Sequence, residues 1–311
     1  MNTFENVQDL LRTKAELTAR LNLIPYDGTV EVKTVSGKKY LYIRKREAGK
    51  VKSDYVGVYS EELHQLLLKN VKDVRELKKE IRTIEKKLSE LGYSSDDLSA
   101  RVLLNLDFAR ANVKSIIYDQ AILEGCATTF PDTESILENG KVNNVSATDV
   151  QKILNLKHAW EFILDKDVIQ SPTNYYVSQY IARIVNEGFF QEGGRIRGVP
   201  VKIGGTTYVP PLPVELDVKE AVETIVNADT EPIDIAIELA LFVMKTQIFN
   251  DGNKRTATIF ANQFLIAHGG GLLVVPETAV PQFKKLLVAY YEDRDVDEIK
   301  KFLKETCWMK F

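Results

Sequence analysis

The segment QIFNDGNKRTA, residues 247 to 257, combines residue types that bind phosphate and a divalent cation. Residues 251–253, Asp-Gly-Asn, form a turn directly before an apolar-periodic stretch. Such a turn at a helix start leaves backbone N–H groups without intrahelical partners, and these attract anions. Lys254 and Arg255 add positive charge, and the Asp251 carboxylate is a hard oxygen ligand suited to magnesium beside phosphates. We expect an anion site with Asp251 as metal ligand; a plain helix N-cap with surface charges is the alternative.

Two expected helices, over 232–247 and 253–268, position this segment. The second carries apolar residues along one face and meets a stop signal at Gly269. The rest of the chain from residue 96 to 311 has the same kind of periodicity, so the pattern predicts a mainly α domain there. Its other expected helices span 97–112, 114–124, 146–166, 173–188, 216–228, 277–291 and 295–305. The exception is 195–211, where short alternating segments flank Gly204-Gly205 and predict a β-hairpin.

Residues 1–95 predict a separate α+β arm. A helix over 5–23 is followed by a three-stranded meander over 28–60, since valines and tyrosines alternate there with polar residues between turn signals. A long charged helix over 61–91 has apolar residues near heptad spacing and is expected to pair with the first helix. GYSSDDLSA, residues 92–100, supplies turn and capping residues and is the candidate domain boundary.

Four segments together resemble the Fic family (the Fic/Doc, or Fido, fold), whose signature is H-x-F-x-[D/E]-G-N-[G/K]-R. They are FNDGNKRTA, the preceding helix PIDIAIELALFVMKTQ, KIGGTTYVPP and QAILEGCATT, and the resemblance covers residues 97–291. Family members transfer AMP, or less often another phosphate-containing group, from a nucleotide to a hydroxyl of a target protein. The resemblance therefore implies a Fic-type helical bundle with a β-hairpin flap, ATP or another nucleotide and Mg²⁺ as cofactors, and a protein substrate that the sequence does not name.

Position by position, the resemblance assigns roles to residues of this chain. Phe249 packs the loop into the core, and Asp251 holds magnesium at the nucleotide phosphates. The implied catalytic set is Gln247, Asp251, Asn253 and Arg255; the implied nucleotide-binding set is Gly252, Asn253, Lys254, Arg255, Glu124 and Gly125. The flap, Gly204, Gly205, Thr206, Thr207 and Tyr208, would clamp an extended target segment by strand addition.

Gln247 departs from the signature because it stands where the family has histidine. That histidine accepts the proton of the target hydroxyl, and an amide has no titratable lone pair near neutral pH. Loss of a positioned base costs about 10²–10⁴-fold in rate, whereas phosphate and magnesium binding depend on other groups. Two alternatives stay open: an adenylyltransferase in which Gln247 only orients the acceptor, and an inactive pseudoenzyme or nucleotide sensor. Lys254 stands where adenylylating members mostly have glycine, which adds a Doc-like protein kinase and leaves AMP, UMP or phosphate as the transferred group.

A second departure concerns regulation. Many Fic proteins carry [S/T]-x-x-x-E-[G/N], whose glutamate obstructs the terminal phosphate by pairing with a second arginine three residues after the first. Here QAILEG supplies Glu124 and Gly125, but Gln120 replaces the hydroxyl residue and Thr258 occupies the place of the second arginine. We therefore expect no ion pair to hold Glu124 in the obstructive position. A hydrogen bond near the loop and a solvated position at the helix end are the two alternatives for this residue.

The meander is rich in positive charge. Eight lysines and arginines lie between residues 31 and 53 against two glutamates, with Tyr40 and Tyr42 among them and Tyr55 following. Such a sheet suits nucleic acid, through phosphate contacts and stacking, or an acidic protein partner. A solvated face that protects strand edges from aggregation is the third alternative.

Composition, net charge and cysteine content exclude few further functions. The 311 residues have a net charge of -3 and 44% hydrophobic content, ordinary for a globular protein. The two cysteines are far apart and have no metal-ligand spacing, which favours a reducing, cytoplasmic location. No window of 18 or more apolar residues is present, so no membrane interaction is expected. The oligomeric state stays open, a homo-oligomer included.

Overall fold

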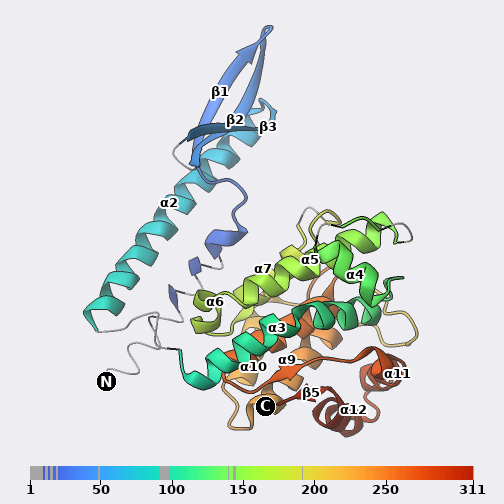
Figure 1. Ribbon diagram of the computed structural model, residues 1–311. Coiled ribbons are helices and arrows are strands. Elements are labelled where there is room, and N and C mark those ends of the chain that lie inside the picture. Colours follow the sequence, from blue (N-terminus) through green and yellow to red (C-terminus); the bar gives the residue numbers. More distant parts are fainter. Residues whose placement is uncertain are drawn as a thin grey trace. The chain divides into compact units, whose positions relative to one another are not determined.

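The computed structural model describes residues 10, 13–14, 17–18, 20–47, 50–91, 98–138, 140–142, 145–190 and 192–310 (Figure 1). The chain divides into two compact units, residues 1–94 and 95–311. Each unit is described by itself.

Unit 1 contains the expected meander and long helix. Strands β1 (Thr29–Val35), β2 (Lys38–Glu47) and β3 (Lys50–Val58) form an antiparallel sheet in the order β1-β2-β3. Helix α2 (Glu61–Glu90) follows. Leu41 and Ile43 point from one face of β2 onto α2, where they form a small core with Leu67. One face of the sheet is therefore covered and the other faces away from α2.

A second small cluster lies further along α2. Leu17 packs there against Leu77, Ile84 and Leu88, so a residue of the first segment does pair with α2 as the apolar spacing predicts. Most of the expected helix over 5–23 lies outside the described residues.

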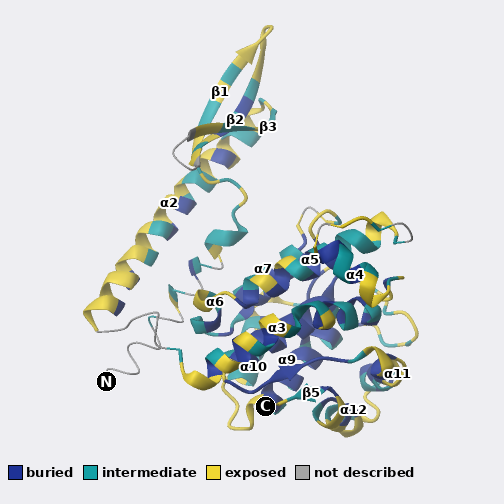
Figure 2. Ribbon diagram, viewed as in Figure 1, coloured by how far each residue is buried: buried dark blue, intermediate teal, exposed yellow. Residues whose placement is uncertain are grey.

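Unit 2 is mainly helical, which confirms the predicted fold class. Its elements are α3 (Ala100–Leu123), α4 (Phe130–Leu137), α5 (Ala147–Ile163), α6 (Lys166–Gln170), α7 (Tyr175–Val185), α8 (Glu215–Val226), α9 (Pro232–Thr246), α10 (Asn253–Ala267), α11 (Val280–Tyr291) and α12 (Val296–Phe302), with a short pair β4 (Leu272–Leu273) and β5 (Trp308–Met309). Helix α10 lies at the centre, and nearly all of its residues are buried (Figure 2).

Local signals explain most of these boundaries. Five helices of unit 2 begin after a Ser, Thr, Asn or Asp whose side chain accepts a hydrogen bond from a backbone N–H of the first turn, as N-caps do: α3, α4, α5, α6 and α7. Pro232 begins α9, where its missing N–H costs no hydrogen bond. No helix in the described ranges is long and apolar enough to cross a membrane.

The predicted elements were wrong in several places. The expected helix over 146–166 is divided, because Asp165 caps the separate helix α6. Residues 97–112 and 114–124 form one helix, α3, because nothing at residue 113 breaks the helical hydrogen bonds; α4 and the β4–β5 pair were not expected. The hairpin over 195–211 is also absent: its residues form no paired strands, only an extended segment with a turn at Gly204–Gly205. Pro200, Pro210 and Pro211 lack the N–H groups a ladder needs.

A buried amide joins α10 to β4. Asn262 is fully buried; its Nδ2 donates to the carbonyls of Thr258 (2.9 Å) and Leu273 (2.8 Å), and its Oδ1 accepts from Leu273 N–H (2.8 Å). The backbone of Leu273 thus has both polar groups satisfied by one side chain.

We expect Asn262→Ala to lower the free energy of unfolding of unit 2 by about 2 kcal/mol or more, because it leaves a buried N–H and carbonyl unpaired. Both tryptophans, Trp160 and Trp308, lie in unit 2, so tryptophan fluorescence in a urea titration reports on this unit alone. Asn227→Ala is the matched control, since Asn227 is an exposed helix C-cap, and should cost under about 0.5 kcal/mol. Equal effects of the two substitutions would contradict the assignment.

Candidate functional site

The loop between α9 and α10 has a backbone that only certain residues adopt. Gln247 ends α9 in the left-handed region with φ 50°, and Gly252, with φ 71°, precedes α10. A Cβ on Gly252 would lie 2.8 Å from the side-chain oxygen of Asn186. Glycine is therefore required at 252 by both conformation and space. No side chain caps the N-terminus of α10, so its first N–H groups keep their capacity to bind an anion.

Asn253 holds the loop together. Its Oδ1 accepts from Phe249 N–H (2.9 Å), and its Nδ2 donates to the Phe249 carbonyl (2.7 Å) and to Gln247 Oε1 (3.2 Å). Phe249 is fully buried beneath this bridge. The amide of Asn253 is thus used inside the loop, and its side chain is not left as a donor for an anion.

Gln247 is also tied into the loop. Its Nε2 donates to the Met244 carbonyl at 2.6 Å, while its Oε1 accepts from Asn253. Both polar ends of the amide therefore have partners in the protein. An amide held in this way orients the loop but offers no basic lone pair for a proton.

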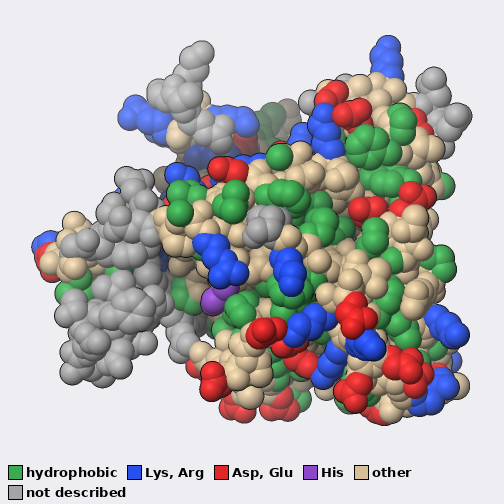
Figure 3. All heavy atoms as spheres, turned by 60° about the horizontal axis from the view of Figure 1, so that its bottom comes forward, with side chains coloured by type: hydrophobic (Ala, Val, Ile, Leu, Met, Phe, Trp, Pro, Cys, Tyr) green, Lys and Arg blue, Asp and Glu red, His purple; other side chains and the backbone are tan. Residues whose placement is uncertain are grey.

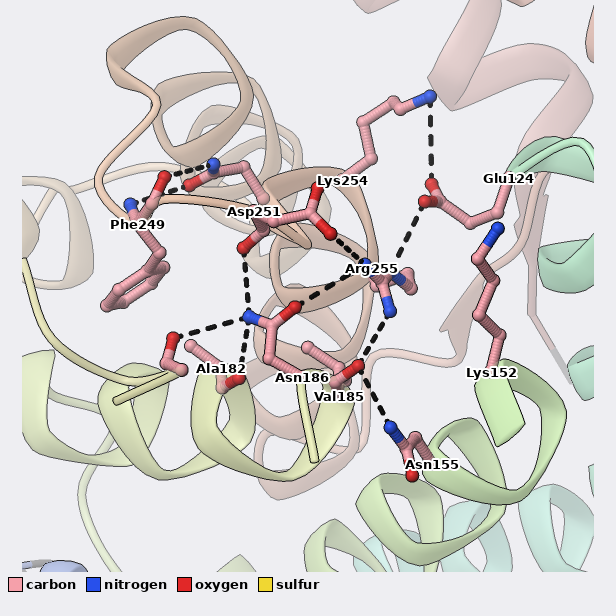
Figure 4. Close-up of polar contacts among 12 residues, drawn as sticks. Glu124, Lys152, Asn155, Ala182, Val185, Asn186, Phe249, Asp251, Lys254 and Arg255 are labelled. Carbon is pink, nitrogen blue, oxygen red and sulfur yellow. Dashed lines mark hydrogen bonds and ion pairs between the residues drawn. The ribbon is translucent and has the colours of Figure 1, made fainter. Parts of the chain in front are cut away.

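Asn186, at the end of α7, fixes the loop from the other side (Figure 4). It is completely buried, and its Nδ2 donates to the carbonyls of Asp251 (2.9 Å), Ala182 (3.0 Å) and Gly193 (3.3 Å). Sequence patterns alone do not single out this residue. An asparagine ending a helix is an ordinary C-cap signal, and its contact lies 65 residues away.

The guanidinium of Arg255 is the centre of the site (Figure 4). The side chain is 3% exposed. Its Nη1 donates to the Val185 carbonyl at 2.6 Å, and its Nη2 donates to Asp251 Oδ2 at 2.9 Å. Its Nε lies 3.3 Å from Glu124 Oε2. A charge at this depth needs opposite charge and hydrogen bonds around it, and α7, the loop and the end of α3 supply them.

Glu124 is therefore ion-paired, although the sequence predicted no ion pair that would hold it in the obstructive position. It pairs with Arg255, and its Oε1 lies 3.7 Å from Lys254 Nζ. Thr258 does stand where the second arginine of the family is found. Glu124 pairs instead with Arg255, the first arginine, because α3 ends directly against the first turn of α10.

Gln120 brings α3 and α10 together. It is buried, its Nε2 donates to the Arg255 carbonyl (3.1 Å), and its Oε1 accepts from Trp160 Nε1 (2.9 Å). Glu124 follows one helical turn later and ends the helix before Gly125, which has φ 78°. Gln120, which stands where the family pattern has a hydroxyl residue, thus makes the contact that positions Glu124.

Positive charge converges on Glu124. Lys152 of α5 extends toward it from the side opposite Lys254 (Figure 4). Glu124 Oε1 and Arg255 Nε are buried and have no hydrogen-bond partner among the described residues. Buried polar atoms left in this state call for a ligand or water. A carboxylate among cations marks a place where another anion could bind.

Asp251 can take part in metal binding only together with other ligands. Its side chain is 53% exposed, with one oxygen on Arg255. In the described part of the chain, no three His, Cys, Asp or Glu residues are grouped to hold a metal ion. Magnesium is commonly held by one or two carboxylates plus the phosphates of a ligand, so a single exposed carboxylate beside an anion site fits that ion.

The segment expected to be the flap is pinned to the residue after α11. Glu292 Oε1 accepts from Thr206 Oγ1 (2.8 Å) and Thr207 N–H (3.2 Å). These hydrogen bonds lower the pKa of the Glu292 carboxyl to about 2. The Tyr208 ring lies nearly parallel to that of Tyr291, 6.3 Å between centroids. Gly205, with φ 83°, makes the turn, and Gly204 precedes it.

Arg197 joins this segment to the loop and was not predicted either. It is 1% exposed and faces no carboxylate among the described residues; it donates to the backbone carbonyls of Gln247, Val199 and Pro211, among others. Burial lowers the pKa of its guanidinium. The carbonyls at the C-terminal end of α9 favour a cation there. Arg197 N–H also donates to Ile248 O (2.9 Å), beside an isolated bridge between Ile196 and Phe249.

The structure thus gathers Gln247, Asp251, Lys254, Arg255 and Glu124 around one helix start. Residues 204–208 are joined to the same loop through Arg197.

Comparison with known proteins finds relatives of this chain. Residues 174–265 match the model of the Fic/DOC family, and residues 4–65 match a domain of unknown function (DUF6788). "Protein adenylyltransferase Fic" of Drosophila mojavensis is 26% identical over 214 residues, 65% of this chain and 42% of the relative. "Protein adenylyltransferase fic-1" of Caenorhabditis elegans is 26% identical over 186 residues, 57% of this chain and 36% of the relative. The chain spans about two fifths of the length of these curated relatives.

Solved structures share the fold. Fic-1 (residues 134–508 of that protein) from C. elegans aligns with a TM-score of 0.52 and 19% identity, covering 78% of this chain and 74% of that one. A Fic-domain-containing signalling protein from Bacteroides thetaiotaomicron aligns with a TM-score of 0.54 and 16% identity, covering 70% and 89%. The loop sequence, the family model matched by residues 174–265 and this shared fold together support a Fic/DOC domain in unit 2.

Proposed function

We propose that unit 2 binds a nucleotide with magnesium at the loop between α9 and α10, and that it transfers AMP slowly or not at all because Gln247 cannot accept a proton. The observation that carries this proposal is the convergence of Lys254, Arg255 and the uncapped start of α10 on the buried carboxylate of Glu124. The names of the relatives, protein adenylyltransferases, support ATP as the nucleotide and a protein hydroxyl as the acceptor.

Phosphate binding depends on groups that the glutamine leaves intact. The N–H groups at the start of α10 and the Lys254 ammonium provide donors and positive charge. Once Glu124 moves away, Arg255 Nε would also donate to the phosphate. Nε has no hydrogen bond, whereas Nη1 and Nη2 of Arg255 are engaged by Val185 and Asp251. Lys152 lies on the far side of the same carboxylate (Figure 4).

Magnesium, when bound, neutralises phosphate charge. Asp251 would hold it through the oxygen that Arg255 does not use, and the phosphates would complete the coordination. The ion pair with Arg255 and the bond from Asn186 to the Asp251 backbone fix where this carboxylate lies.

Transfer of AMP requires a step that this loop does not support well. The hydroxyl oxygen of the acceptor forms a bond to the α-phosphorus, the bond to the pyrophosphate oxygen breaks, and the hydroxyl proton must leave. Histidine would take that proton, but Gln247 has both amide groups engaged by Met244 and Asn253. Binding without efficient transfer is the result.

Glu124 would compete with the nucleotide. A bound phosphate and the carboxylate cannot share the Arg255 Nε and Lys254 without repulsion, so the free energy of the ion pairs opposes nucleotide binding. We infer that Glu124 lowers the affinity for nucleotide until it is displaced.

Asp251→Asn should remove the magnesium-dependent part of nucleotide binding. We expect ATP affinity, measured by calorimetry, to rise about tenfold or more on adding magnesium to the parent protein and to change less than about twofold in the variant. Asp107→Asn is the control, because Asp107 is an exposed aspartate of α3 that lies more than four helical turns before Glu124. An undiminished magnesium effect in Asp251→Asn would remove this residue from the metal site.

Glu124→Gln should bind ATP with magnesium about tenfold or more tightly than the parent, because it removes the competing charge and keeps the side-chain volume. Glu161→Gln, at an exposed position on α5, makes the same chemical change and should leave the dissociation constant unaltered. Unchanged or weaker binding in Glu124→Gln would show that this carboxylate does not occupy the phosphate position.

Gln247→His should restore the proton acceptor. We expect labelling of protein by ATP carrying the label on the α-phosphate to increase about 10²–10⁴-fold over the parent. Gln247→Asn keeps an amide and tolerates the left-handed conformation, so its labelling should stay at the parent level. Label transferred from the γ-phosphate instead would indicate phosphoryl transfer. No gain in either experiment, with nucleotide binding intact, would mean that the loop differs from an active site in more than its base.

A further inference from the structure

Positive charge is concentrated in unit 1. Residues 1–94 contain 19 Lys and Arg against 14 Asp and Glu, a net charge of +5, whereas residues 95–311 contain 22 against 30, a net charge of -8. On the face of unit 2 that carries α11 and α12, acidic and basic side chains lie interspersed (Figure 3). Such a charge difference between two parts of one chain is typical of a basic module that binds a polyanion.

The outer face of the unit 1 sheet carries aromatic and cationic side chains together. Successive residues of a strand point to opposite faces, and Leu41 and Ile43 point toward α2. The other face of the sheet therefore holds the residues that alternate with them. We call this set the tyrosine face: Tyr40, Tyr42, Arg44 and Arg46 of β2, Lys33 of β1 and Tyr55 of β3.

The three tyrosines form one cluster. Tyr42 and Tyr55 are direct cross-strand partners with ring centroids 5.6 Å apart, and Tyr40 lies 6.2 Å from Tyr55. Tyr55 is 57% exposed. Lys33 Nζ lies 4.6 Å from the centre of the Tyr42 ring, and Arg44 and Arg46 continue along the same strand. Ring faces and positive charges are thus presented side by side. The same face holds one carboxylate, Glu31, which is the cross-strand partner of Tyr42 and lies 3.3 Å from Lys33 Nζ.

We propose that the tyrosine face binds single-stranded nucleic acid, with bases stacking on the tyrosines and phosphates contacting Lys33, Arg44 and Arg46. Aromatic side chains on a sheet with cations beside them suit unpaired bases, because every base has a π-face and each nucleotide carries a phosphate. Bases inside a duplex are already stacked and cannot use the rings.

Neither protection from aggregation nor an acidic protein partner accounts for the whole tyrosine face. Lysines on strand edges prevent aggregation, but β2 is the central strand and its half-buried tyrosines lie beside the exposed Tyr55, where solubility does not call for aromatic residues. An acidic protein would satisfy the cations but has no specific need for three clustered rings. The pairing of rings with cations favours the nucleic acid.

The test measures binding of the full chain to labelled oligonucleotides by fluorescence anisotropy, with excess magnesium and ATP present so that the nucleotide site of unit 2 does not contribute. The probes are a uridine dodecamer, a deoxythymidine dodecamer, a 12-base-pair duplex and a polyglutamate peptide of similar charge. We expect at least one single-stranded probe to bind about tenfold or more tightly than duplex and peptide, with affinity that falls as salt rises from about 50 to about 200 mM. The uridine and deoxythymidine arms distinguish RNA from DNA.

Variants separate stacking from charge. Tyr42→Leu and Tyr55→Leu should each weaken single-strand binding at least about fivefold, whereas Tyr42→Phe and Tyr55→Phe, which keep the ring, should stay within about twofold. Arg44→Ala with Arg46→Ala should weaken binding and reduce the dependence on salt. The matched control is Lys72→Ala with Lys86→Ala, which removes the same charge from exposed positions on α2 and should have a smaller effect.

Several results would overturn the proposal. Equal affinity for duplex or polyglutamate would identify a general anion or acidic-protein surface. Loss of binding in the phenylalanine variants as well as the leucine variants would show that ring stacking is not involved. Absence of binding to both single strands at the lower salt concentration, with a circular dichroism spectrum that shows folded protein, would exclude it outright.

Discussion

The buried guanidinium of Arg255 is the interaction on which the site depends. A charge that is 3% exposed must be compensated by neighbouring groups, and the chain supplies two carboxylates and a backbone carbonyl from three separate elements. Asp251 is thereby fixed in the loop, the end of α7 is held against it, and the end of α3 is drawn in through Glu124. The two carboxylates offset the positive charge and the Val185 carbonyl accepts a hydrogen bond from it, so α3, the loop and α7 meet at the start of α10.

The same compensation sets the proposed balance between binding and obstruction. Glu124 satisfies the charge of Arg255 when no other anion is present, and a phosphate would satisfy it in the same place. In the proposed function, Glu124 would therefore compete with the nucleotide, and the cost of displacing it would limit the affinity for nucleotide. Gln247 would affect the transfer step and not binding. Its amide maintains the loop through Met244 and Asn253 but cannot accept the proton of an acceptor hydroxyl. Loss of the base and retention of the binding groups are therefore compatible within one loop.

A second buried arginine has a different role and no acidic partner in the described part of the chain. Arg197 binds backbone carbonyls from the end of α9 and from both ends of the segment that contains residues 204–208. Prolines in that segment lack the N–H donors that strand pairing needs. Hydrogen bonds from Arg197 hold the two ends of the segment together instead. The segment keeps an extended shape by side-chain contacts, with Glu292 fixing the turn at Thr206 and Thr207. The tyrosine face of unit 1 is independent of these contacts and depends only on the alternation of its strands.

Local residue order was enough to predict the helical bundle, the three-stranded meander and the glycine turn before α10, because apolar periodicity, capping residues and turn residues act over a few neighbouring residues. The resemblance to the Fic/DOC family came from the loop motif. Local residue order did not predict the partner of Glu124, the roles of Asn186 and Arg197, or the absence of strands over 195–211. The three contacts that define those residues join groups that lie 131, 65 and 50 residues apart in the chain. A buried charged side chain pairs with the opposite charge that helix packing places beside it. These two groups are close to each other only in the folded chain.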